Sequence, residues 1–140
     1  MIFVKEFIYC AFAAFAFAFL FNAPRRSLLV TALVSAVGYV LYSLIAVGGN
    51  PIIGFFAGTA LIALGSELAA RKLKMPVNVF ISAAVIPLVP GIGLYQTMLS
   101  MVQGKYSLAF STFVSAMLAI SAMAVAIAMV SFVFRVTLKR

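Results

Sequence analysis

Five long apolar stretches dominate the sequence, and each is long enough to cross a bilayer as a helix. A transmembrane helix needs about 20 apolar residues. The stretches are continuously apolar, whereas the strands of a membrane barrel alternate polar and apolar residues. We therefore expect an all-α, polytopic membrane protein. Its single transmembrane domain would cover 1–140, with helices at approximately 3–21, 28–47, 51–70, 77–102 and 107–134.

The composition argues against a soluble enzyme. Only 9% of the residues are charged and 66% are hydrophobic, whereas a soluble domain carries about 25% charged residues. The sequence has no histidine, which excludes a histidine-based metal site or catalytic triad within this chain. Its single cysteine, Cys10, cannot form a disulfide within the chain. We expect no enzymatic activity, no metal and no cofactor.

The basic residues predict the orientation in the membrane. They form short clusters between the apolar stretches, a pattern typical of membrane topology rather than of nucleic-acid binding. If all five stretches cross, eight basic residues lie on one side and only Lys5 and Lys105 on the other. Because Lys and Arg are enriched in cytoplasmic loops, we expect the N-terminus outside and the C-terminus in the cytoplasm. The eight residues are Arg25, Arg26, Arg71, Lys72, Lys74, Arg135, Lys139 and Arg140.

The fourth stretch contains two prolines and two glycines within seven residues. Pro87 and Pro90 each remove an amide donor, and Gly91 and Gly93 favour a non-helical backbone. We expect two half-helices that meet near the bilayer midplane, where irregular backbone is tolerated only against protein or a water-filled cavity. The second half-helix would point its free amides and positive dipole end at the midplane, where they could bind a carboxylate. The alternative is a plain proline kink.

Polar residues flank the predicted break. Asn78 precedes it, and Tyr95, Gln96 and Thr97 follow it. Together with the prolines and glycines of the break, they are the candidate substrate-binding residues. The same residue types form hydrogen bonds between membrane helices. This alternative is at least as favourable for the second-stretch stripe formed by Thr31, Ser35, Gly38 and Tyr42.

Small residues indicate close helix packing in three stretches. In the first, Phe12, Phe15 and Phe19 share one face and Ala11, Ala14 and Ala18 another, which predicts a lipid-facing side and a packing side. The third stretch carries a row formed by Gly54, Gly58 and Gly65. The fifth carries a row formed by Ser111, Ser115, Ala119, Ala122 and Ala126.

Glu67 is the one acidic residue away from the N-terminal end of the sequence. Ionisable groups within a membrane often mark an ion or proton pathway, so Glu67 is the candidate for ion coupling. Arg71 follows four residues later, a spacing that also favours an ion pair on a helix. The two interpretations remain open. Glu6, beside Lys5, is interpreted as an interfacial charge.

Three segments, in order, resemble one known family: FNAPRR at 21–26, SELAARKLKMP at 66–76 and IPLVPGIGLY at 86–95. The chain resembles the small subunit, the C-terminal-half type, of the threonine/serine exporter family, which includes two-component dicarboxylate exporters for acids such as succinate. The resemblance implies export of small carboxylate-bearing metabolites across a bacterial inner membrane. It also implies a larger membrane subunit as partner, with a homo-oligomer as a further possibility and no nucleic acid. The alternative function is a non-transporting scaffold subunit.

Overall fold

The computed structural model describes residues 2–137, which form helices and no strand. Lys139 and Arg140, two of the basic residues counted above, lie outside the described residues. Four helices are long and apolar enough to span a membrane, and a bent helix pair makes a fifth candidate span, which confirms the all-α polytopic fold. The elements are α1 (Ile2–Leu20), α2 (Arg25–Val47), α3 (Pro51–Leu73), α4 (Asn78–Val85), the 3₁₀ turn η1 (Ile86–Leu88), α5 (Gly91–Val102) and α6 (Tyr106–Thr137).

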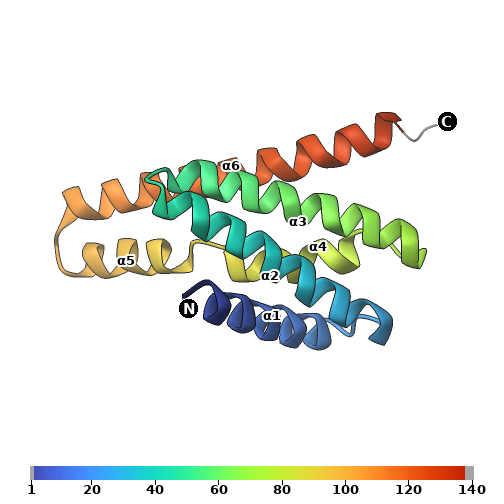
Figure 1. Ribbon diagram of the computed structural model, residues 1–140. Coiled ribbons are helices and arrows are strands. Elements are labelled where there is room, and N and C mark those ends of the chain that lie inside the picture. Colours follow the sequence, from blue (N-terminus) through green and yellow to red (C-terminus); the bar gives the residue numbers. More distant parts are fainter. Residues whose placement is uncertain (1, 138–140) are drawn as a thin grey trace.

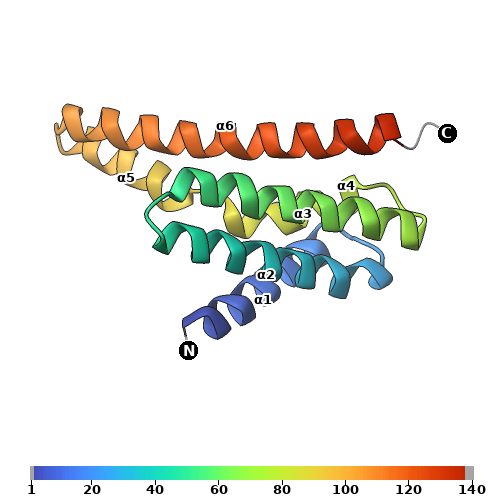
Figure 2. The ribbon, with the colours of Figure 1, turned by 45° about the horizontal axis from the view of Figure 1, so that its top comes forward.

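The antiparallel pair α2–α3 forms the centre of the molecule. α1 packs on α2, and α6 packs on α3 (Figures 1 and 2). α4 and η1 fill the space between α1, α2 and α3. By contrast, among the described elements α5 packs against α6 alone. Figure 1 shows that α5 and the first turns of α6 extend beyond the loop that joins α2 to α3.

Glycines bring the backbones of α2 and α3 into contact. A Cβ atom added at Gly58 would lie 2.8 Å from the carbonyl oxygen of Gly38 and 3.0 Å from the Cβ of Tyr42. A Cβ atom at Gly38 would collide with the side chain of Ile62. Only glycine therefore fits at this crossing, and the prediction of close packing on α3 is confirmed.

The lipid-facing and packing sides predicted for α1 are confirmed except at Phe15, which is half-buried and packs against the cluster of Ala18, Leu28 and Ala83. Ala14 and Ala18 are fully buried, whereas Phe12 and Phe19 are 75% and 68% exposed. In a membrane, an exposed phenylalanine face is solvated by lipid rather than by water.

On α6 the packing prediction is correct only in part. Ala119 and Ala126 are buried against neighbouring helices. Ser111 and Ser115 are exposed instead, because this part of α6 lies beyond the α2–α3 pair (Figure 1). The two serines therefore need another explanation than helix packing within this chain.

α4, η1 and α5 together form one broken span. The axis of α5 is bent by 51° from that of the preceding helical segment. A re-entrant loop would have to reverse its direction, whereas a 51° bend preserves it. With this bent pair counted as one span, the chain has five candidate spans, which run back and forth along the molecule (Figures 1 and 2).

These five spans gather the basic residues at one end of the molecule, which we call the basic end. It comprises the start of α2, the end of α3 with the loop after it, and the end of α6. Lys5 and Lys105 lie at the opposite end, near the start of α1 and just before α6. The basic residues described at the basic end are Arg25, Arg26, Arg71, Lys72, Lys74 and Arg135.

Candidate functional site

The backbone of the broken span departs from a helix at Val89 and Pro90. Because residue 90 is a proline, the carbonyl of Ile86 cannot receive an amide from that position, and it accepts the Val89 amide at 3.1 Å instead. Pro90 has φ −74° and ψ 60°, and the Gly91 amide donates to the carbonyl of Val89 at 2.7 Å. This is an inverse γ-turn. The two expected half-helices are present, so the break is more than a kink.

The second half-helix begins with free amide donors. The first intrahelical bond of α5 runs from the Leu94 amide to the Pro90 carbonyl at 3.3 Å. Within residues 2–137, the amides of Ile92 and Gly93 have no backbone acceptor, as is usual in the first turn of a helix. These donors and the positive end of the helix dipole can stabilise an anion.

The first half-helix is held by a buried hydrogen bond. Ser35 Oγ, on α2, donates to the carbonyl of Ala84 at 2.7 Å. Phe80 and Ala84 are fully buried, and Leu88 is 2% exposed next to Gly58. Of the two interpretations of the α2 stripe, interhelical hydrogen bonding is therefore confirmed for Ser35.

A hollow of about 340 Å³ lies beside the break, between α3, α5 and α6. Its volume is at the lower end of the range for small-molecule sites, about 300–1,000 Å³. We call it the α3–α5–α6 groove. It is lined by Pro51, Ile52, Phe55, Pro90, Gly93, Gln96, Ser111, Thr112, Ser115, Ala116 and Ala119.

The groove contains three of the residues predicted from the sequence: Pro90, Gly93 and Gln96. Gly93 sits against α6, where an added Cβ atom would lie 3.5 Å from that of Ala116. Two other predicted residues, Gly91 and Tyr95, are exposed, and a Cβ atom at Gly91 would meet nothing within 4 Å. Pro87 is half-buried in η1.

Thr97 is buried and already hydrogen-bonded. Its hydroxyl donates to the carbonyl of Gly93 at 2.8 Å and lies 3.1 Å from the hydroxyl oxygen of Thr112. The pair joins α5 to α6 at the edge of the groove. Its position supports a structural role, while Gln96 lines the groove.

Sequence reasoning missed the hydroxyl residues that α6 contributes to the groove. Ser111 Oγ and Ser115 Oγ each donate to a backbone carbonyl of α6 at 3.0 Å, and Thr112 does so at 2.9 Å. Their oxygen lone pairs remain as acceptors. The signal in the sequence is a group of three hydroxyl residues close to the start of an apolar helix. Ser111 and Ser115 were predicted as packing positions, and Thr112 was not singled out.

Asn78 and Glu67 lie away from the groove, at the basic end. Both line a second hollow of about 670 Å³, which we call the vestibule. The structure therefore separates the predicted substrate residue Asn78 from Gln96. The vestibule is lined by Glu67, Ala70, Arg71, Lys74, Met75, Pro76, Val77, Asn78, Ile81, Ile127, Ser131 and Arg135.

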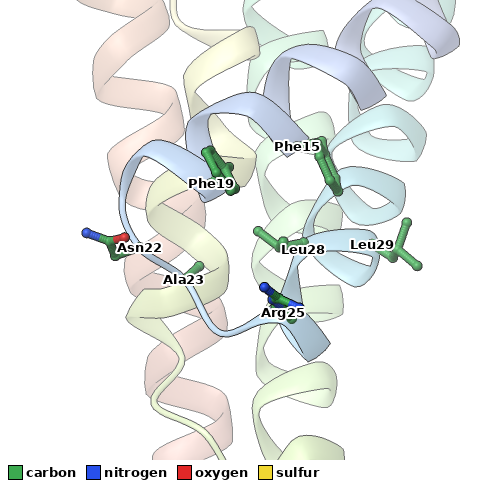
Figure 3. A pocket seen from close by; sticks show the side chains of 7 residues that line it. All are labelled: Phe15, Phe19, Asn22, Ala23, Arg25, Leu28 and Leu29. Carbon is green, nitrogen blue, oxygen red and sulfur yellow. The ribbon is translucent and has the colours of Figure 1, made fainter.

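A third hollow, of about 620 Å³, lies where α1 ends and α2 begins (Figure 3). Phe15 and Phe19 come from α1, and Leu28 and Leu29 from α2. Its lining is apolar apart from Asn22 and Arg25. It therefore offers fewer converging polar groups than the groove or the vestibule.

Comparison with known proteins places the chain in a family. Residues 6–133 match the sequence model of the family described as Threonine/Serine exporter, ThrE. The chain is also 37% identical over 100 residues to an uncharacterized protein of Haemophilus influenzae, an alignment that covers 70% of this chain and 33% of that protein. The chain thus matches about a third of the length of this relative, and no solved structure matches it. Because the family match extends over most of its length, the chain belongs to the threonine/serine exporter family.

Proposed function

We propose that this chain is the small membrane subunit of a bacterial inner-membrane exporter for small carboxylate-bearing metabolites. The substrate would be threonine and serine, or a dicarboxylate such as succinate. The observation that carries the proposal is the broken span, whose second half begins with free amides beside an open groove. Transporters commonly place their substrate site at such a discontinuous helix.

The chemistry of the groove supports a ligand with a carboxylate. The first turn of α5 supplies amide donors, and the side-chain amide of Gln96 supplies more. The hydroxyls of Ser111 and Ser115 donate their hydrogen bonds to backbone carbonyls, so toward the groove they can act only as acceptors. A carboxylate would bind to the donors of α5. The ammonium or hydroxyl group of an amino acid would bind to the acceptors of α6.

The proposed topology gives the route that an exported substrate would take through the molecule. The basic end would face the cytoplasm, because basic residues are retained there. The N-terminus would then lie outside, and α3 would carry Glu67 toward the cytoplasmic surface. Substrate would enter from the basic end and leave near the loop that joins α5 to α6.

We also propose that a larger membrane subunit of the same family covers the groove. Gln96, Ser111 and Ser115 are exposed on an otherwise apolar surface, and polar groups facing lipid are costly. The Haemophilus influenzae relative is about three times as long as its aligned part, so it contains additional chain. In our proposal the surface that covers the groove comes from the larger subunit, with further copies of the chain as the alternative.

Export measurements test the proposal. Cells loaded with threonine, serine or succinate would express the chain, the larger subunit, or both. We expect export with both, and loss of export in the double variant Pro90→Ala, Gly91→Leu. Alanine at position 90 restores an amide that can bond to the Ile86 carbonyl, and leucine favours a continuous helix.

The matched control is Pro24→Ala, in the exposed turn between α1 and α2. This variant should export at the rate of the unmodified protein. Unchanged export in the double variant, with normal insertion into the membrane, would contradict the assignment of the break as the substrate site.

The alternative, a non-transporting scaffold, is favoured by one observation: α5 has no packing partner but α6 among the described elements. A scaffold would use this free surface only to bind the larger subunit. In that case the double variant, or omission of this chain, would lower the amount of the larger subunit in the membrane. Export per molecule of larger subunit would remain the same.

A further inference from the structure

The vestibule at the basic end is built from three parts of the chain. The last turns of α3 and the loop after it contribute Glu67, Arg71 and Lys74. Asn78 stands at the first position of α4, and Arg135 comes from the last turn of α6. Helices that lie far apart in the sequence thus surround one hollow of about 670 Å³.

The charges of the vestibule are unequal in number. Three cationic side chains and one carboxylate line it. A cleft with an excess of one sign concentrates ligands of the opposite sign. The vestibule should therefore attract anionic groups from the cytoplasmic side under the proposed topology.

Arg71 contacts α6 rather than Glu67. One guanidinium nitrogen of Arg71 donates to the carbonyl of Phe134 at 3.4 Å. The guanidinium also lies 5.0 Å from the centre of the Phe134 ring, within the range of a cation–π interaction. Within residues 2–137, Glu67 forms no ion pair with Arg71 within 4.0 Å. The ion-pair interpretation of Glu67 is therefore not supported, and its carboxylate remains available to a ligand.

We infer that the vestibule is the loading site for a zwitterionic α-amino acid. The ligand carboxylate would bind to Arg71, Lys74 or Arg135, and the ligand ammonium would bind to Glu67. A dicarboxylate has no cation to offer Glu67 and would be repelled by it. Glu67 thus determines specificity for amino acids over dicarboxylates, a role distinct from ion coupling. The inference rests on the proposed function for its transport role, and its binding role can be tested separately.

The test uses a single cysteine in the vestibule. Ser131 is half-buried and lines it, so the variant Cys10→Ser, Ser131→Cys places one thiol beside the ligand. Inside-out membrane vesicles would expose the basic end to two thiol reagents, anionic MTSES and cationic MTSET. We expect MTSES to label this thiol at a higher rate than it labels a free thiol. Threonine should slow the labelling.

Glu67→Gln and Glu67→Asp then separate binding from folding. The glutamine variant should weaken protection by threonine about tenfold, a loss expected for one charged hydrogen bond of about 1.4 kcal/mol. It should at the same time increase protection by succinate. The aspartate variant keeps the charge and should retain protection by threonine. A control thiol at Asn22→Cys, in the α1–α2 turn, should label equally in all variants, with or without threonine.

Several outcomes would overturn the inference. The first is that neither threonine nor succinate slows labelling of the thiol at position 131. The second is that, with Glu67 in place, succinate slows labelling and threonine does not. The third is that threonine protects the Glu67→Gln variant as well as it protects the protein that retains Glu67. A further arm compares vesicles with and without anionic lipid. If removal of anionic lipid accelerates labelling while threonine has no effect, a lipid headgroup occupies the vestibule instead. Threonine protection without any export would retain the loading site and contradict only the proposed function.

Discussion

The two halves of the broken span have different surroundings. The half formed by α4 and η1 is enclosed by α1, α2 and α3, and Phe80 and Ala84 are fully buried. The half formed by α5 packs on α6 alone, with Tyr95 and Met98 exposed at 66% and 68%. One apolar stretch of sequence is therefore buried in its first half and largely exposed in its second half. The α3–α5–α6 groove lies where the second half begins, next to the free amides of its first turn.

The largest expected difference between the halves is in the stability lost when a large side chain is truncated to alanine. Phe80→Ala should lower the free energy of unfolding by about 3 kcal/mol, at the low end for a buried phenylalanine because lipid reduces the transfer term. Met98→Ala, on the exposed face of α5, should lower it by less than about 0.5 kcal/mol. Thermal or denaturant unfolding in detergent would compare the two. Similar losses would show that α5 is enclosed in the native protein, contrary to the comparison.

A side chain added to a glycine should have the next largest effect. Gly58→Leu would drive a side chain into the backbone of α2 and cost about 2 kcal/mol, because a Cβ atom there lies 2.8 Å from the Gly38 carbonyl oxygen. Gly91→Ala, at the start of α5, should leave stability unchanged or slightly raised. The same unfolding assay measures both. An unchanged free energy of unfolding in Gly58→Leu would contradict this expectation. It would mean that α2 and α3 can move apart without loosening the packing of α4.

The hydrogen bond that holds α4 should contribute less. Ser35→Ala removes the donor to the buried Ala84 carbonyl and should cost about 1 kcal/mol. Ser111→Ala, on the exposed part of α6, should cost less than about 0.5 kcal/mol. Hydrogen exchange of the α4 amides would report the loosening directly. Unchanged exchange after Ser35→Ala would show that packing alone fixes α4.

The smallest expected effect is at the Thr97–Thr112 hydrogen bond between α5 and α6. Thr97→Val keeps the shape of the side chain and removes its hydrogen bonds to Gly93 and Thr112. Interhelical hydrogen bonds in membranes contribute about 0.6 kcal/mol on average. We expect faster hydrogen exchange in α5, with α4 unaffected. Faster exchange in both halves would show that they unfold as one unit.

The fold could be predicted well from the sequence because hydrocarbon leaves few alternatives. Each apolar stretch had to form a helix, and two prolines with two glycines had to interrupt the fourth. The structure has α1, α2, α3, the broken pair and α6 at the corresponding places. The exposed phenylalanines and buried alanines of α1 also followed from their spacing alone.

The composition of the candidate site could be predicted only in part, because it depends on tertiary placement. Gln96 and Gly93 reach the groove, but Asn78 lies with Glu67 at the other end of the span. Nothing in the spacing of Glu67 and Arg71 shows that Phe134, sixty-three residues beyond Arg71, holds the guanidinium. Likewise, Ser111 and Ser115 resemble packing residues until α5 and α6 are seen to extend beyond the bundle.

In the proposed exporter, the start of α5 borders a water-accessible site rather than lipid. Single cysteines at Gln96→Cys and Met98→Cys, in a Cys10→Ser background and with the larger subunit present, test it most directly. A hydrophilic thiol reagent should label position 96 rapidly and position 98 slowly, and threonine or succinate should slow the labelling at 96 alone. Equal, slow labelling at both positions, unaffected by either ligand, would contradict the account.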